Sequence, residues 1–188
     1  MFRNPLWATC FPAVFAEGVV VFGLMPYIAT ILEVRGMGGM REAGFVVAGL
    51  GIGGIVYTLL VPFLLAKIGQ ASIVRLGGVV ALLGYSAVPF AASWPLQALA
   101  FGLSGLGFYM VHNALQLLAT ELAPQARGSA TAMHAFWFFL GHAMGPLFYR
   151  VAFDWLGTGP AILIAGLVML AISLRVASVL PVRKPALA

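Results

Sequence analysis

Two groups of polar side chains lie inside long apolar stretches, where they could do chemistry. Glu17 falls about ten residues into the first stretch. His112, Asn113 and Gln116 follow one another at spacings that place them on one face of a helix, and Tyr109 extends that face. A carboxylate in such a position can pair with a cation, line a hydrated cavity or carry a proton. An aromatic ring, an imidazole and two amides suit a substrate with polar and apolar parts.

Each group also has a structural interpretation. Glu17 can act as a protonated acid that donates a hydrogen bond to a neighbouring helix. The polar face can form bonds between helices, which contribute about 0.6 kcal/mol per contact in membranes. We predict the functional roles: proton coupling for Glu17, and substrate binding for Tyr109, His112, Asn113 and Gln116. No second His or carboxylate accompanies His112 at ligand spacing, so we expect no metal site and no cofactor.

Two further histidines occur in one later stretch. His134 lies near one end of it, and we expect its side chain to snorkel toward the membrane interface. His142 lies within Gly141-x-x-x-Gly145-Pro146. Small residues at this spacing let helices approach closely, and proline kinks a helix. We therefore predict a packing role for this segment, with a gating hinge as the alternative.

A pattern of glycines resembles a nucleotide-binding turn. The letters Gly-x-Gly-x-x-Gly begin at Gly49, but a dinucleotide site needs a preceding strand and an acidic residue about 20 positions later. The next acidic residue is Glu121, and the glycines lie inside the uncharged run 43–66. We instead predict that Gly49 and Gly53 form a surface for close helix packing.

The composition excludes an ordinary soluble domain. The 188 residues are 62% hydrophobic and only 8% charged, with a mean hydropathy of +1.05, whereas soluble domains carry about 25% charged residues. The net charge of +5 comes from basic residues scattered between apolar runs. Such scatter does not form the basic face that nucleic acid requires. We expect a lipid bilayer as the surroundings and no nucleic-acid partner.

The apolar stretches predict an all-α membrane protein with six transmembrane helices, because each has about the 20 residues that one crossing needs. Ser93-Trp94-Pro95 divides an uncharged run that is too long for one crossing. We treat the whole chain, 1–188, as a single transmembrane bundle. The predicted spans are 7–32, 43–66, 75–93, 96–120, 128–150 and 157–180.

The Lys and Arg residues predict the orientation, since cytoplasmic segments carry an excess of positive charge. Segments on the side of the termini hold Arg3, Lys67, Arg75, Arg127, Arg175, Arg183 and Lys184, and the opposite segments hold Arg35, Arg41 and Arg150. We therefore expect both termini in the cytoplasm. The polar residues are concentrated in the first, fourth and fifth spans, while the third and sixth are almost wholly apolar. This distribution fits two inverted three-helix repeats.

Several strings together resemble the C-terminal six-helix half of a major facilitator superfamily transporter, in the bacterial drug-efflux and proton-antiporter branch. They are "AEGVVVFGLMPYIATIL", "AGLGIGGIVYTLLVPFLLAKIG", "GLGFYMVHNALQLLATELAPQARGSA" and "FWFFLGHAMGPL". The superfamily's signature loop is matched only at Lys67 and Gly69. Such transporters have twelve helices, which leaves open a fragment, a truncated gene or a half that pairs with another chain.

The resemblance implies a function and partners. It implies proton-coupled efflux of a small molecule by alternating access in the bacterial inner membrane, without enzymatic activity. Glu17 would exchange protons while the polar face from Tyr109 to Gln116 contacts substrate. The partner would be an N-terminal six-helix half or a second copy. The alternative within this class is a non-transporting half or a truncated remnant.

A rival from another class is an intramembrane serine protease. Gly102-Leu103-Ser104-Gly105 matches the Gly-x-Ser-Gly signature of rhomboid proteases, and His142 lies at a similar depth to Ser104. A serine nucleophile needs a histidine base within hydrogen-bonding distance. The rhomboid base belongs on the sixth helix, however, and the predicted sixth span contains no histidine.

Overall fold

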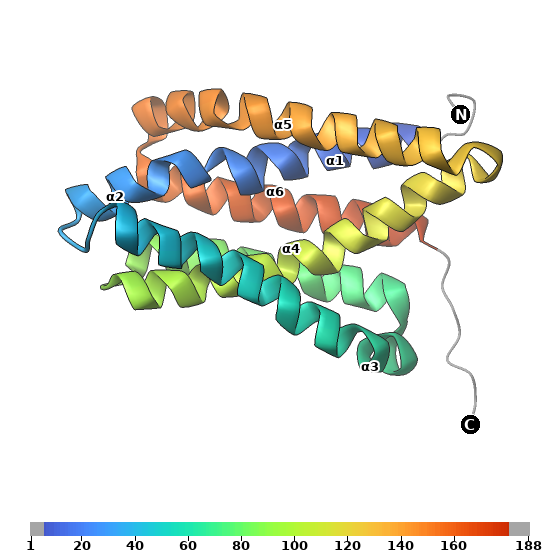
Figure 1. Ribbon diagram of the computed structural model, residues 1–188, viewed down its shortest axis with the longest axis horizontal. Helices are drawn as coiled ribbons and strands as arrows, with labels where there is room; N and C mark the ends of the chain where they lie inside the picture. The colour runs from blue at the N-terminus through green and yellow to red at the C-terminus, as the bar shows by residue number, and fades with distance from the viewer. Residues whose placement is uncertain (1–5, 181–188) are drawn as a thin grey trace.

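The computed structural model describes residues 6–180 and shows only helices there, running roughly along the long axis of one bundle (Figure 1). Arg3, Arg183 and Lys184, which contributed to the predicted orientation, lie outside the described residues. The elements are α1 (Trp7–Gly23), η1 (Met25–Tyr27), α2 (Ile28–Val34), α3 (Met40–Ala87), η2 (Val88–Phe90), α4 (Trp94–Leu122), η3 (Pro124–Ala126), α5 (Arg127–Leu156) and α6 (Thr158–Val179).

The first predicted span is an almost continuous helical segment made of α1, η1 and α2. Pro26 interrupts it, because proline has no backbone N–H to donate to the helix. The chain tightens there into the short 3₁₀ turn η1, in which the Tyr27 N–H donates to the Leu24 carbonyl at 3.0 Å. The Tyr27 hydroxyl also donates to the Pro146 carbonyl of α5 at 2.7 Å, which ties this turn to the neighbouring helix.

Helix α3 reverses direction at Gly69. This residue has φ 72° and ψ 165°, a backbone conformation that glycine adopts at low cost. Gly49 and Gly84 lie on opposite sides of the reversal, yet both contact the same region of α4, from Ala98 to Ser104. The two halves of α3 therefore run side by side in opposite directions. The predicted span 43–66 lies in the first half of α3, and the predicted span 75–93 begins in the second half. The segment between these two spans contains the reversal at Gly69.

Four segments within residues 6–180 are long and apolar enough to cross a membrane: Trp7–Val34, Met40–Phe90, Trp94–Leu122 and Thr158–Val179. Helix α5 is long enough but is not among them. It carries two histidines, two arginines and an aspartate, and it extends six residues beyond the predicted span 128–150. The prediction of an all-α membrane protein is confirmed.

Glycines bring α1 and α5 into backbone contact. A Cβ atom at Gly23 would lie 2.6 Å from the Cα atom of Gly145, and one at Gly18 would lie 3.3 Å from the Cα atom of Gly141. Only a residue without a side chain permits such an approach. The buried hydroxyl of Tyr149 adds a hydrogen bond, which it donates to the Val20 carbonyl of α1 at 2.8 Å. Helices α1 and α5 thus form a tightly packed pair.

A second set of glycines packs α3 against α4. A Cβ atom at Gly49 would meet the Ala98 carbonyl oxygen, and one at Gly53 would meet backbone atoms of Gly102 and Leu106. Gly51, by contrast, faces open space, with nothing within 4 Å of a Cβ atom built there. The glycine string therefore has one packed face and one open face.

The reversals of the chain fall at two ends of the bundle. The turn at Gly69, the α4–α5 connection and both ends of the described chain lie at one end (Figure 1). The α2–α3 and α5–α6 connections and the start of α4 lie at the other. At this second end the guanidinium of Arg35 donates to the carbonyls of Val88 (3.3 Å) and Ala91 (2.7 Å), which joins the end of α2 to the turn after α3.

Candidate polar site between α1, α4 and α5

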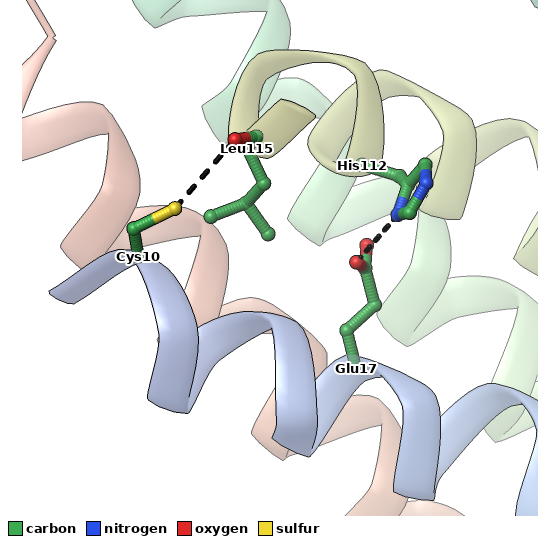
Figure 2. Close-up of polar contacts among 4 residues, drawn as sticks. All are labelled: Cys10, Glu17, His112 and Leu115. Atoms are coloured by element: carbon green, nitrogen blue, oxygen red, sulfur yellow. Dashed lines mark hydrogen bonds and ion pairs between the residues drawn. The ribbon is translucent and has the colours of Figure 1, made fainter. Parts of the chain in front are cut away.

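Glu17 and His112 form a hydrogen-bonded pair between α1 and α4. His112 Nδ1 lies 2.8 Å from Glu17 Oε2, although 95 residues separate them in the sequence (Figure 2). The Glu17 side chain is fully buried, and that of His112 is 18% exposed. The sequence allows three roles for Glu17: pairing with a cation, lining a hydrated cavity or carrying a proton. The structure shows Glu17 paired with a group that becomes a cation when it binds a proton.

The second carboxylate oxygen of Glu17 has no hydrogen-bond partner within the described chain. Oε1 is buried, so neither a protein donor nor bulk solvent stabilises it there. An unpaired buried charge is costly, and a proton shared with His112 removes most of that cost. The pair can therefore hold one proton on either partner, either as carboxylate and imidazolium or as two neutral groups.

Aromatic rings enclose His112. Its ring centroid lies 5.0 Å from that of Phe108 on α4 and 4.9 Å from that of Phe138 on α5. Phe22 of α1 packs edge-to-face against both phenylalanines, with ring centroids 5.9 Å and 5.2 Å away. These rings exclude water from one side of the Glu17–His112 pair, which strengthens its electrostatic interaction.

His134 does not snorkel, and that prediction is wrong. Its side chain is only 3% exposed, and its ring lies edge-to-face on the His112 ring with centroids 5.1 Å apart. Its Nε2 atom is buried without a hydrogen-bond partner in the described chain. His142 is half-buried and stacks on Phe22, with centroids 4.6 Å apart, which is consistent with a packing role. The sequence signal missed was the depth of His134, two helical turns inside α5.

The four residues of the predicted substrate face divide into two environments. His112 points to Glu17, and Tyr109 lies half-buried against Gly54 of α3. Asn113 and Gln116 are exposed on the surface of the bundle. Amides in the middle of a spanning helix are poorly solvated by lipid, so they favour a surface facing water or protein. This part of α4 thus presents polar groups both to the buried pair and to the outside.

Cys10 makes a second polar contact across the same junction. Its thiol lies 3.6 Å from the Leu115 carbonyl oxygen and donates to it (Figure 2). Cys10 precedes Glu17 by seven residues, and Leu115 follows His112 by three, so both contacts lie on the same two helix faces. Sequence reasoning did not identify this contact, although the seven-residue spacing could have indicated a shared face.

The serine protease alternative lacks its geometry. The Ser104 hydroxyl donates to the Ala100 carbonyl at 3.0 Å, is buried, and lies against Gly84 of α3. His142 packs on Phe22, and no hydrogen bond joins it to Ser104 in the part of the chain that the structure describes. Ser104 therefore has no base that could activate it. Residues 6–180 also contain no group of three or more His, Cys, Asp or Glu side chains that could hold a metal ion.

Comparison with known families decides the class of the protein. The model of the Major Facilitator Superfamily matches residues 1–146. The chain belongs to the Major Facilitator Superfamily. Membership in this superfamily indicates membrane transport rather than enzymatic catalysis. The matched part includes Glu17, His112 and His134, while the last ten residues of α5 and the whole of α6 lie beyond it. No curated protein sequence matches the chain significantly.

Proposed function

We propose that this superfamily member carries out proton-coupled efflux of a small molecule by alternating access. In this proposal the chain provides the C-terminal half of the carrier, with six spans arranged as two inverted three-helix repeats. The observation that carries the proposal is the buried Glu17–His112 pair, with its 2.8 Å contact between α1 and α4. Intramembrane ionisable pairs of this kind typically mark ion or proton pathways.

The location of the pair supports coupling between proton binding and movement. Glycines pack α1 tightly against α5 and α3 tightly against α4, whereas Glu17 and His112 join one of these packed pairs to the other. Release of the shared proton would leave a buried carboxylate without a cationic partner, which is unfavourable until water reaches it. Proton release is therefore tied to opening between α1 and α4.

Substrate binding is proposed for the polar face of α4. Asn113 and Gln116 are exposed. They follow Tyr109 and His112 on the same helix, and His112 is bonded to Glu17 in the proton site. Carriers of this kind bind substrate near the bilayer midplane, between two helical bundles. The proposed partner covering this face is an N-terminal six-helix half or a second copy of the chain. The direction, efflux, rests on the resemblance of the sequence to drug and proton antiporters.

The proposed location is the bacterial inner membrane, with both termini in the cytoplasm. Lys67 and Arg75 flank the reversal at Gly69, Arg127 begins α5 and Arg175 lies near the end of α6; these element ends lie at the end of the bundle that holds the described termini (Figure 1). Arg35 and Arg41 flank the α2–α3 connection and Arg150 lies near the end of α5, at the other end of the bundle. The excess of positive charge then lies on the cytoplasmic side. Labelling of single cysteines introduced at the Lys67 and Arg150 positions in intact cells tests this orientation: only the second should react with a membrane-impermeant reagent.

Proton exchange in inverted membrane vesicles tests the function. Vesicles containing the full protein are acidified inside by respiration, and a pH-sensitive dye reports loss of the gradient on addition of amphipathic cations, sugars or small metabolites. At least one compound should dissipate the gradient with wild-type protein but not with Glu17→Gln. Glu33→Gln, which neutralises an exposed carboxylate of the same segment, should behave as wild type. Equal dissipation by Glu17→Gln and wild type would refute proton coupling through Glu17.

Substrate binding has a separate test with the compound found in this way. Asn113→Ala and Gln116→Ala should each raise its half-saturating concentration by about tenfold, the effect of losing one hydrogen bond of about 1.4 kcal/mol. Ser178→Ala, at an exposed position of α6, serves as the control. Unchanged half-saturation in both amide variants would show that the binding face is elsewhere.

A further inference from the structure

We propose that His134 completes a three-residue proton site with Glu17 and His112, in which one proton moves between the pair and the His134 ring. The inference rests on the proposed function in that the proton is the coupled ion. It adds a residue and a direction of transfer that the pair alone does not provide.

The geometry places the three side chains in sequence across three helices. Glu17 of α1 contacts His112 of α4 at 2.8 Å, and the His112 ring meets the His134 ring of α5 with centroids 5.1 Å apart. Phe138, one turn beyond His134 on α5, also packs on the His112 ring and closes one side of the contact. His134 is therefore held beside the ring that carries the proton in the ionised form of the pair.

Unpartnered atoms lie at both ends of this sequence. Glu17 Oε1 and His134 Nε2 are buried and have no hydrogen-bond partner in the described chain. Buried polar atoms in folded proteins are nearly always bonded to protein or to ordered water. In the tautomer that carries its hydrogen on Nδ1, His134 Nε2 has a free electron pair and fits the receiving end of a transfer.

The transfer balances without another reactant. The N–H bond of the His112 imidazolium breaks, and its proton passes to a bridging water, which gives one of its own protons to the electron pair on His134 Nε2, because no hydrogen bond joins the two rings directly. His112 becomes neutral, His134 becomes the imidazolium, and Glu17 remains a carboxylate. Two imidazolium rings at 5.1 Å repel each other, so the site favours one proton at a time on the two histidines.

The position of His134 gives the transfer a direction. His134 lies seven residues after Arg127, which begins α5 next to the α4–α5 connection at the end of the bundle holding the described termini (Figure 1). That distance is about 10 Å along a helix. A proton on His134 is thus within two turns of that end of the bundle, which the proposed orientation places in the cytoplasm.

The ionisable groups around the site are few. From α4, His112 faces His134 directly, and from α1, Glu17 acts through His112 while Cys10 lies within electrostatic range of Glu17. From α3, the buried Tyr85 also lies within electrostatic range of Glu17. His142, two turns further along α5, stacks on Phe22 instead.

Nitrogen NMR of the full protein, labelled with ¹⁵N-histidine in lipid bilayers, tests the site with pH as the only variable. The chain contains three histidines, so single His→Gln replacements assign every signal. In wild-type protein the imidazolium fractions of His112 and His134 should sum to no more than about one across the titration. Independent titration of both rings to a sum of two would overturn the proposal.

Variants separate a proton role from a structural one. Glu17→Gln should move the titration midpoints of both His112 and His134 by about one pH unit or more, which is a tenfold or larger change in proton affinity. The reason is that this variant removes the carboxylate beside the shared proton. His134→Gln should likewise move the midpoint of His112. A His134 curve that is identical in wild type and Glu17→Gln would contradict the shared site, even if every variant folds.

The outcome does not depend on transport. If the histidines titrate as one site but Glu17→Gln leaves vesicle proton exchange intact, the shared site stands and the proposed function fails. If Glu17→Gln abolishes exchange but His134 titrates independently, the function stands and the third residue is overturned.

Discussion

Breaking the Glu17–His112 pair from one side should destabilise the protein far more than removing both partners. His112→Phe keeps a ring against Phe108 and Phe138 but leaves the Glu17 carboxylate buried without a donor. Two unit charges about 4 Å apart interact by about 4 kcal/mol at an effective dielectric constant of 20. Removing one partner of a buried pair costs about 3–5 kcal/mol. Because His112 is 18% exposed, we expect about 3 kcal/mol for His112→Phe.

The remaining corners of this double-mutant cycle follow from the same reasoning. Glu17→Leu leaves only the partly exposed His112 Nδ1 without an acceptor, which should cost about 1–2 kcal/mol. The double variant Glu17→Leu/His112→Phe has no orphaned polar group, and it should lie within about 1 kcal/mol of wild type. The two residues should therefore show a coupling free energy of at least about 3 kcal/mol in magnitude.

Reversible unfolding in mixed micelles, followed by helical circular dichroism, measures the cycle. The exposed pair Arg150–Asp154 is the matched control, since its contact of 2.9 Å is equally short but its side chains are 69% and 52% exposed. Breaking it with Asp154→Asn should cost less than about 0.5 kcal/mol. Additive effects of Glu17→Leu and His112→Phe would refute the view that the buried pair shares a charge.

The same cycle has a dependence on pH with a definite sign. In His112→Phe the penalty comes from an unpaired negative charge, and acid removes this charge by protonating the carboxyl. The stability deficit of His112→Phe relative to wild type should therefore shrink as the pH falls, whereas that of Glu17→Leu should not shrink in the same way. A deficit for His112→Phe that is constant with pH would show that lost packing, not charge, causes it.

Three further predictions concern the glycines and helix ends. Gly53→Leu should destabilise the protein by at least about 3 kcal/mol, because the new side chain would collide with the α4 backbone. Gly51→Leu, at a position that faces open space, should cost less than about 1 kcal/mol. Unfolding in micelles compares the two variants. Arg35→Gln should cost about 1–2 kcal/mol by removing two bonds to carbonyls, and the exposed Arg41→Gln less than about 0.5 kcal/mol. Gly69→Ala should cost about 1–3 kcal/mol and lower the thermal midpoint, because a side chain is strained at φ 72°.

The all-α, membrane-spanning character of the chain followed from composition and hydropathy, because both report directly on the bilayer. The last span, predicted as 157–180, is observed as α6 (Thr158–Val179), bounded by Gly157 with its positive φ of 83°. The length of α5 was underestimated because the prediction ended it at Arg150. A charged residue usually ends an apolar span, but Arg150 pairs with Asp154 one turn later on the surface and the helix continues.

The reversal in α3 illustrates a limit of apolar runs as evidence. The prediction placed a connecting segment between 66 and 75 but did not identify Gly69 as the turning point. Lys67 and Arg75 indicated where the chain meets water, whereas the turn itself depends on one residue with a positive φ. Hydropathy averages over many residues, and a reversal made by one backbone conformation is not resolved by such an average.

The candidate site was found in parts but not as a whole. Intramembrane position alone identified Glu17 and His112 as functional candidates, since an ionisable group in a membrane needs an explanation. Their pairing could not be predicted, because helical spacing describes one helix at a time and says nothing about which face meets which neighbour. The contact of His134 with the His112 ring could not be predicted for the same reason, although the depth of His134 in its helix did indicate that the side chain is buried.

The arrangement of glycines and polar groups explains why a site of this kind lies where it does. Backbone contacts through glycine, as between Gly23 and Gly145, pack α1 tightly against α5 and α3 tightly against α4. Between these pairs, α1 packs against α4 through Phe22 and Phe108. It also makes two polar contacts with α4, the weak thiol bond of Cys10 and the ionisable bond of Glu17 (Figure 2). Of these contacts, the Glu17–His112 bond is the one whose strength depends on a proton. In the proposed mechanism, a change in protonation acts at the junction between the two packed pairs rather than within them, which is where a small electrostatic change can alter their relative position.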